Sequence, residues 1–78
     1  MYFVIYTRKT EVANTTEAYA INPSYAPDAQ STAFTFYKQT SGYSLVQALL
    51  KTDGKIQLMA STYNEPLAGT FFWMYVKS

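Results

Sequence analysis

The densest hydrophobic pattern of the chain lies in residues 70–77, where six large apolar or aromatic side chains follow one another. Their aromatic and β-branched content favours a strand over a helix. Because successive side chains of a strand point to opposite faces, Trp73 and Tyr75 lie on the face opposite to that of Phe72. Both faces are apolar, so the pattern predicts a central strand that needs cover on both sides.

Three further segments have strand patterns. Residues 2–7 are an uninterrupted β-prone run, and residues 32–39 alternate, with Phe34 and Phe36 expected to face the core. Residues 55–62 alternate again. The turn residues between this segment and residues 70–77 predict that the two form an antiparallel hairpin.

One helix is expected, at residues 45–51. Leu45, Ala48 and Leu49 fall at i, i+3 and i+4 and would form one apolar stripe, and Gly54 follows as a stop signal. A helix of about two turns is not stable alone in water, so it must pack on a sheet. The strands before and after it could be parallel, joined by a right-handed crossover.

Residues 10–32 are less regular. Residues 16–22 are expected to form a short strand that pairs with residues 2–8, the alternative being a helical turn, and residues 23–30 form a surface loop. The chain is therefore expected to be a single small α+β domain over residues 1–78. Its order is β-β-β-α-β-β, with a mostly antiparallel sheet of four to five strands and one short helix on one face.

Composition argues against most catalytic chemistry. The chain has no cysteine and no histidine, which removes thiolate chemistry, the commonest metal ligand and the commonest general base. The carboxylates lie singly at loops and element ends, and the three glycines are too far apart to form a phosphate loop. We therefore expect no enzymatic activity, no cofactor and no metal site.

Charge bears on partners and location. The formal net charge is +1 and only 14% of residues are charged. Such a chain produces no strong field for nucleic acid or an anionic membrane. No signal-peptide pattern precedes the first strand, so we expect an intracellular, cytoplasmic protein. Binding of single-stranded nucleic acid through exposed aromatic side chains stays open as an alternative, although phosphate neutralisation would be weak.

Aromatic residues are in surplus: eight tyrosines, five phenylalanines and one tryptophan. One small helix cannot cover them all, and interface cores are rich in Tyr, Trp and Met. The sequence therefore predicts a protein-binding module that occludes or bridges a larger partner. In size and composition it is comparable to inhibitors encoded by phages and mobile elements. A homodimer is a further alternative. The expected contact residues are Tyr19, Tyr25, Tyr37, Met59, Tyr63, Trp73 and Tyr75.

Overall fold

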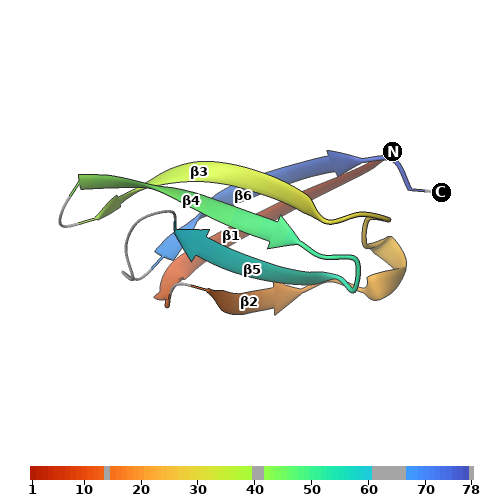
Figure 1. Cartoon of the computed structure of the whole chain (residues 1–78), viewed down its shortest axis with the longest axis horizontal. Coiled ribbons are helices and arrows are strands. Elements are labelled where there is room, and N and C mark those ends of the chain that lie inside the picture. The colour runs from red at the N-terminus through yellow and green to blue at the C-terminus, as the bar shows by residue number, and fades with distance from the viewer. Residues whose placement is uncertain (14, 40–41, 61–66, 78) are drawn as a thin grey trace.

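The computed structural model describes residues 1–13, 15–39, 42–60 and 67–77, and most of these residues lie in antiparallel strands. The strands are β1 (Tyr2–Val12), β2 (Thr16–Ala20), β3 (Ser31–Gln39), β4 (Gly42–Leu50), β5 (Lys55–Ala60) and β6 (Leu67–Tyr75), and a 3-10 turn, η1, spans Pro23–Tyr25. β1 pairs with β6, and the second sheet has the order β2-β5-β4-β3. The four-stranded sheet lies across the two-stranded sheet (Figure 1). The predicted antiparallel strands are thus confirmed, but the predicted α+β class with one sheet is wrong: the described residues form a small all-β domain of two sheets, with η1 as its only helical element.

The hydrophobic core lies between these two layers. Val46, Ala48 and Leu50 of β4 and Ile56 and Leu58 of β5 point into it, because alternate strand residues face opposite sides of a sheet. From the two-stranded sheet, Phe71 and Trp73 fill the other half of the core. The buried residues of the core are Ala33, Val46, Ala48, Leu50, Ile56, Leu58, Phe71 and Trp73.

The predicted helix at residues 45–51 is wrong, because residues 45–50 belong to the strand β4. Val46, Ala48 and Leu50 are fully buried, and the residues between them are half-buried, which is the two-residue period of a strand. β4 is a central strand, with β3 on one side and β5 on the other. Its apolar residues fit both a helical stripe and a strand covered on both faces, and sheet pairing decides between them.

Two of the predicted strand pairings are also wrong. A strand within residues 16–22 is confirmed as β2, but it pairs with β5 and not with residues 2–8. The segments at 55–62 and 70–77 do not form a hairpin with each other, since β6 pairs with β1 and β5 pairs with β4 and β2. No parallel crossover joins β3 to β5. β3, β4 and β5 instead form an antiparallel meander.

The face prediction for β3 is inverted. Phe34 and Phe36 are exposed, whereas Ala33 is buried and Thr35 is half-buried. The reason is the close approach of β6, where a β-carbon added at Gly69 would lie 2.8 Å from the Thr35 Cγ2 atom. Beside Gly69 only a small side chain fits on the core side of β3, and Phe34 and Phe36, which flank Thr35, project outward.

Candidate protein-interaction surfaces

The two-stranded sheet buries one face and leaves the other bare. Phe3 and Ile5 of β1, and Phe72 and Met74 of β6, point away from the core and are each more than half exposed. We call these four residues the β1–β6 outer face. In the strand register Phe3 is opposite Met74 and Ile5 is opposite Phe72, so the two rings occupy one diagonal. The ring centroids of Phe3 and Phe72 lie 6.2 Å apart.

The β1–β6 outer face has an apolar end and a polar end. At the apolar end the same alternation places Val76, which is 73% exposed, in line with Met74. At the other end the Thr7 and Thr70 hydroxyl oxygens are 3.2 Å apart and share a hydrogen bond. An uncharged apolar surface with a polar border is typical of protein interfaces, whose cores are depleted of charge and whose rims are polar.

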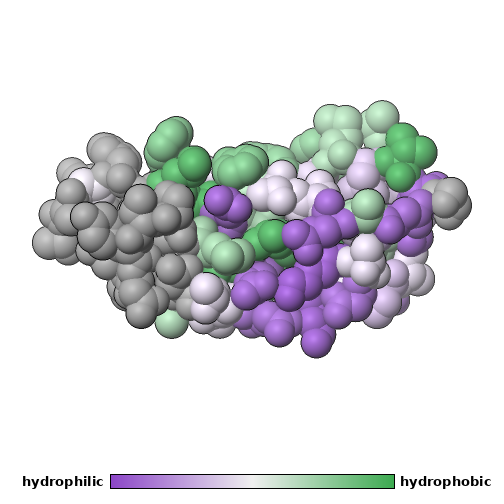
Figure 2. Space-filling view, viewed as in Figure 1, coloured by the Kyte–Doolittle hydropathy of each residue, from purple (hydrophilic) through white to green (hydrophobic). Residues whose placement is uncertain are grey.

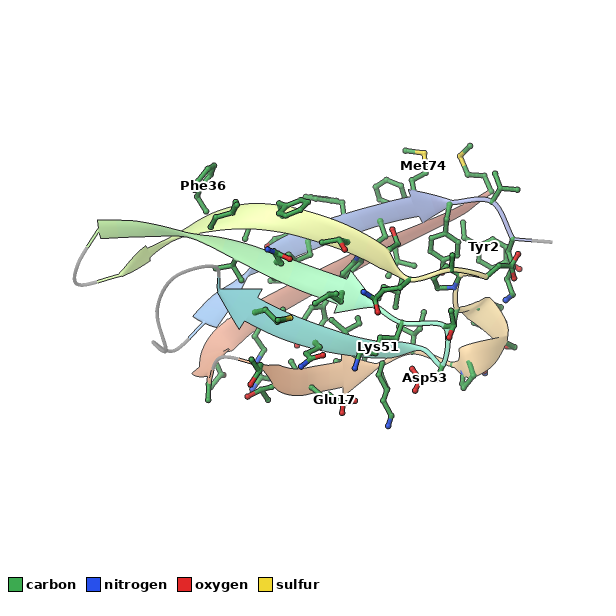
Figure 3. All side chains as sticks on the ribbon, viewed as in Figure 1. Tyr2, Glu17, Phe36, Lys51, Asp53 and Met74 are labelled. Carbon is green, nitrogen blue, oxygen red and sulfur yellow. The ribbon has the colours of Figure 1, made fainter. Side chains whose placement is uncertain are left out.

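A second apolar feature lies on the outer side of β3. Phe34 is 58% exposed and Phe36 is 71% exposed, and we call this pair the Phe34–Phe36 ridge. Their cross-strand neighbours on β4, Gln47 and Leu45, carry no charge. Figure 2 shows hydrophobic side chains gathered along the upper margin of the molecule, over β3 and the end of β6. Figure 3 shows Phe36 and Met74 projecting from this same margin.

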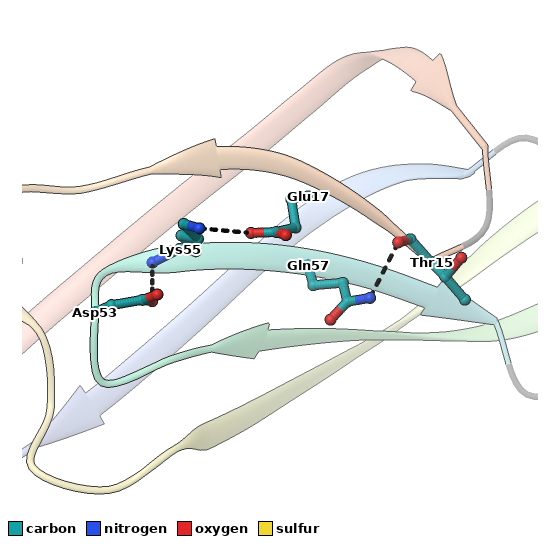
Figure 4. A network of polar contacts seen from close by, with 5 residues as sticks. All are labelled: Thr15, Glu17, Asp53, Lys55 and Gln57. Atoms are coloured by element: carbon teal, nitrogen blue, oxygen red, sulfur yellow. Dashed lines mark hydrogen bonds and ion pairs between the residues drawn. The ribbon is translucent and has the colours of Figure 1, made fainter.

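The opposite margin carries hydrophilic side chains (Figure 2). Its polar groups link β2 to β5 and close the turn between β4 and β5 (Figure 4). The ammonium of Lys55 lies 3.7 Å from a Glu17 carboxylate oxygen, and the Asp53 carboxylate accepts a hydrogen bond of 3.1 Å from the Lys55 backbone N–H. The Gln57 amide donates to the Thr15 carbonyl at 3.0 Å. Glu17, Lys55 and Gln57 thus link β2 to β5, and Asp53 is engaged within the turn between β4 and β5.

Tyr25 and Tyr75, both predicted contact residues, anchor the loop between β2 and β3. The Tyr75 hydroxyl donates to the Tyr25 carbonyl, and the Tyr75 ring stacks on that of Tyr2 with centroids 5.7 Å apart. Burial raises the pKa of the Tyr75 phenol, and the Tyr2 phenol raises it further. The Tyr25 ring is still 55% exposed, so its solvent side is available to a partner.

Lys77 ties the same loop to the end of β6. Its ammonium donates to the Ala26 carbonyl at 2.6 Å and lies 3.6 Å from an Asp28 carboxylate oxygen. Ala26 itself is fully buried. The loop between β2 and β3 is therefore packed against the ends of β1 and β6, and its residues contribute to the packing of the domain.

Two other predicted contact residues differ sharply in accessibility. Trp73 is 2% exposed and lies between the sheets, so its ring is not presented to a partner. Its indole N–H and the hydroxyl of Tyr6 are buried, and neither has a hydrogen-bond partner among the described residues. Tyr19 is 58% exposed and stacks on Tyr6 at 5.5 Å between centroids.

The remaining predicted contacts are less informative. Met59 is half-buried on the outer side of β5. The side chain of Tyr37 lies outside the described part of the structure, as does the whole of Tyr63. The β1–β6 outer face and the Phe34–Phe36 ridge were not among the predicted contacts. The alternation of Phe72, Met74 and Val76 was the available signal for the first of them.

The chain shows neither a recognisable type of site among its described residues nor a match to a known protein. Among the described residues, no three His, Cys, Asp or Glu side chains lie close enough to hold a metal ion. The described part of the chain also contains no helix of the length and hydrophobicity needed to span a membrane. No protein-family model, curated protein or solved structure matches the chain.

Proposed function

We propose that this chain is a small non-catalytic protein-binding module that occludes or bridges a larger protein partner. The observation that carries the proposal is the exposure of large uncharged side chains on the outer sides of both sheets. A monomer in water rarely leaves contiguous apolar patches of this kind uncovered unless they bind something.

The Phe34–Phe36 ridge is the surface that we assign to the larger partner. Two phenylalanine rings two residues apart on one strand can insert side by side into an apolar pocket, as the aromatic anchors of protein interfaces do. Thr32, also exposed on this side of β3, supplies a neutral hydrogen-bonding neighbour. The mechanism is steric, because desolvated rings at the centre of a contact give affinity and the surrounding domain blocks access to the partner's surface.

Affinity capture with matched variants tests this proposal. The wild-type chain, Phe34→Ser, Phe36→Ser and the control Lys55→Ser are immobilised and exposed to the same cell extract. We expect the wild type and Lys55→Ser to retain one shared protein partner and both ridge variants to lose it. Equal retention by all four proteins would refute the assignment of the ridge. Far-UV circular dichroism checks that each variant is folded.

Single-stranded nucleic acid is the alternative occupant of the ridge, because bases stack on exposed aromatic rings. Opposite the ridge, however, Leu45 and Gln47 supply no positive charge for phosphate groups. We therefore expect no retention of the protein on single-stranded DNA or RNA at physiological salt. Retention that falls steeply with added salt would favour the nucleic-acid function instead.

A further inference from the structure

We infer that the β1–β6 outer face binds a second copy of this chain, so that two molecules form a dimer with the two-stranded sheets stacked face to face. The inference goes beyond the proposed function, which concerns the Phe34–Phe36 ridge. It rests on the register of β1 and β6, on the exposed area of the face and on its lack of charge.

The register makes the face self-complementary, as a twofold-symmetric contact requires. Phe3 is opposite Met74, and Ile5 is opposite Phe72. A twofold axis between the two layers and parallel to the strands places β1 of one copy over β6 of the other. Each phenylalanine ring then lies over an aliphatic side chain, Phe3 over Met74 of the second copy and Phe72 over Ile5 of the second copy. Aligned sheets of this kind pack about 10 Å apart.

The exposed area is sufficient for a pair of molecules. The four side chains of the face, together with Met1 and Val76, are each more than half exposed. Each leaves on the order of 100 Å² uncovered, so two copies together would bury roughly 1,200 Å². This is the lower end of the range for specific interfaces, and it indicates a dimer that dissociates on dilution.

Charge also favours a second copy. From the Phe3–Met74 pair to the Thr7–Thr70 pair, the outward positions of this sheet are Phe3, Ile5 and Thr7 on β1 and Thr70, Phe72 and Met74 on β6, and none of them is charged. The first charged residue in line with them, Lys9, comes after the Thr7–Thr70 pair. A partner therefore needs no complementary charge, and the net charge of +1 gives little repulsion between two copies. The Thr7–Thr70 pair supplies a polar border on both copies.

Such a dimer has a functional consequence. The Phe34–Phe36 ridge belongs to the four-stranded sheet and is not among the contact residues of the two-stranded sheet, although Phe36 projects from the same margin as Met74 (Figure 3). In this arrangement each copy keeps its own ridge beside the contact, and the dimer presents two of them. Two linked ridges can bridge two partner molecules, or bind two sites on one partner more tightly than a single ridge does.

Sedimentation equilibrium from low micromolar to submillimolar concentration tests the inference. We expect the wild type and the ridge variant Phe36→Ser to shift from the mass of one chain to twice that mass, and Phe72→Ser and the milder Ile5→Thr to remain at one chain. A wild type that is monomeric over the whole range would overturn the inference. So would dimerisation that is lost in Phe36→Ser and kept in Ile5→Thr, because it would place the contact on the ridge.

Crosslinking tests the geometry directly, since the chain contains no cysteine. Thr7→Cys and Thr70→Cys, which keep all four side chains of the face, are prepared with tags of different size, mixed and treated with a short bis-maleimide. The same twofold axis places Thr7 of one copy over Thr70 of the other. We therefore expect this mixture to yield a covalent heterodimer of the two tagged chains, and a mixture of Thr7→Cys with Phe36→Cys to yield no heterodimer. Equal yields from both mixtures would contradict the stacked arrangement. None of these outcomes depends on capture of a larger partner by the ridge, so the two proposals can fail independently.

Discussion

Gly54 occupies a position where any β-carbon would clash with the backbone of a neighbouring segment. Its φ angle is +90°, and an added β-carbon would lie 2.5 Å from the Ile21 carbonyl oxygen. Its own carbonyl accepts a 2.9 Å hydrogen bond from the Ile21 N–H, and its N–H donates to Lys51. Gly54 thus closes the turn between β4 and β5 and holds the end of β2 against it.

We expect Gly54→Ala to lower the free energy of unfolding by about 2–4 kcal/mol, through backbone strain and the clash together. Gly42→Ala is the matched control. Gly42 also has a positive φ angle, +122°, but a β-carbon there would meet nothing within 4 Å. Urea unfolding of both variants gives the comparison, and equal losses of stability would show that the contact with Ile21 contributes nothing.

The ionisation of the Tyr75 phenol makes the free energy of unfolding depend on pH in the alkaline range. Burial, and then the neighbouring Tyr2 phenol, raise the pKa of Tyr75 in the folded state. The folded chain therefore keeps this proton at a pH at which the unfolded chain has lost it. The contribution to stability is complete below about pH 10, the ordinary pKa of tyrosine, and is lost as the pH rises through the raised pKa. An ionised phenol also cannot donate to the Tyr25 carbonyl.

We expect Tyr75→Phe to lose about 0.5–1.5 kcal/mol of stability at neutral pH, the usual contribution of one hydrogen bond. Above about pH 10 the free energy of unfolding of the wild type should fall more steeply than that of the variant, so that their difference narrows. Urea unfolding followed by Trp73 fluorescence at a series of pH values measures both curves. Parallel curves would rule out Tyr75 as the group responsible.

Among the elements, β4 shows where sequence patterns reach their limit. Its apolar residues satisfy a helical stripe and a doubly covered strand equally well, and Gly54 can end a helix or close a hairpin. The pair Asp53-Gly54 between two hydrophobic runs was the better signal, because it is typical of a tight hairpin turn. In the structure the Asp53 carboxylate accepts a hydrogen bond from the Lys55 N–H within this turn.

The strands themselves could be predicted, but their partners and faces could not. Residues 2–7, 32–39 and 70–75 lie in strands, as their β-prone runs predicted, whereas Val76 and Lys77 follow the end of β6. The pairing of β1 with β6 joins the two ends of the sequence, and no local pattern contains that information. The orientation of Phe34 depends on the close approach of β6 at Gly69, which is likewise a property of the assembled layers.

The contributions of a buried and an exposed phenylalanine to stability can be compared on β6 and β3. Phe71 of β6 is fully buried, whereas Phe36 of β3 is 71% exposed. We expect Phe71→Ala to cost about 3–5 kcal/mol, because it removes buried surface and leaves a cavity. Phe36→Ala should change stability by less than about 0.5 kcal/mol. Thermal and urea unfolding compare the two variants, and similar losses would contradict the assignment of the faces.

At the scale of the whole molecule, the paired strands of the two sheets differ greatly in their separation along the sequence. β3, β4 and β5 are neighbours in sequence and pair in that order, whereas in the other sheet Tyr2 is opposite Tyr75. Bringing distant residues together costs chain entropy before any contact forms. The two-stranded sheet has little to stabilise it until it packs on a core that already exists. Because the local pairings cost less chain entropy, we expect the β3-β4-β5 meander to form early and β1 and β6 to dock on it late.

Folding kinetics test this order through one substitution in each layer. Ala48→Gly weakens the centre of β4, where Ala48 is fully buried, and Val4→Ala removes a side chain of β1 that packs against the core. If the meander forms first, Ala48→Gly should mainly slow folding, with a φ-value above about 0.5, and Val4→Ala should mainly accelerate unfolding, with a φ-value below about 0.3. Stopped-flow fluorescence of Trp73 at protein concentrations below dimerisation provides both rates. The reverse pattern would mean that the two chain ends meet before the meander is complete, and that the long-range β1–β6 pairing nucleates the fold.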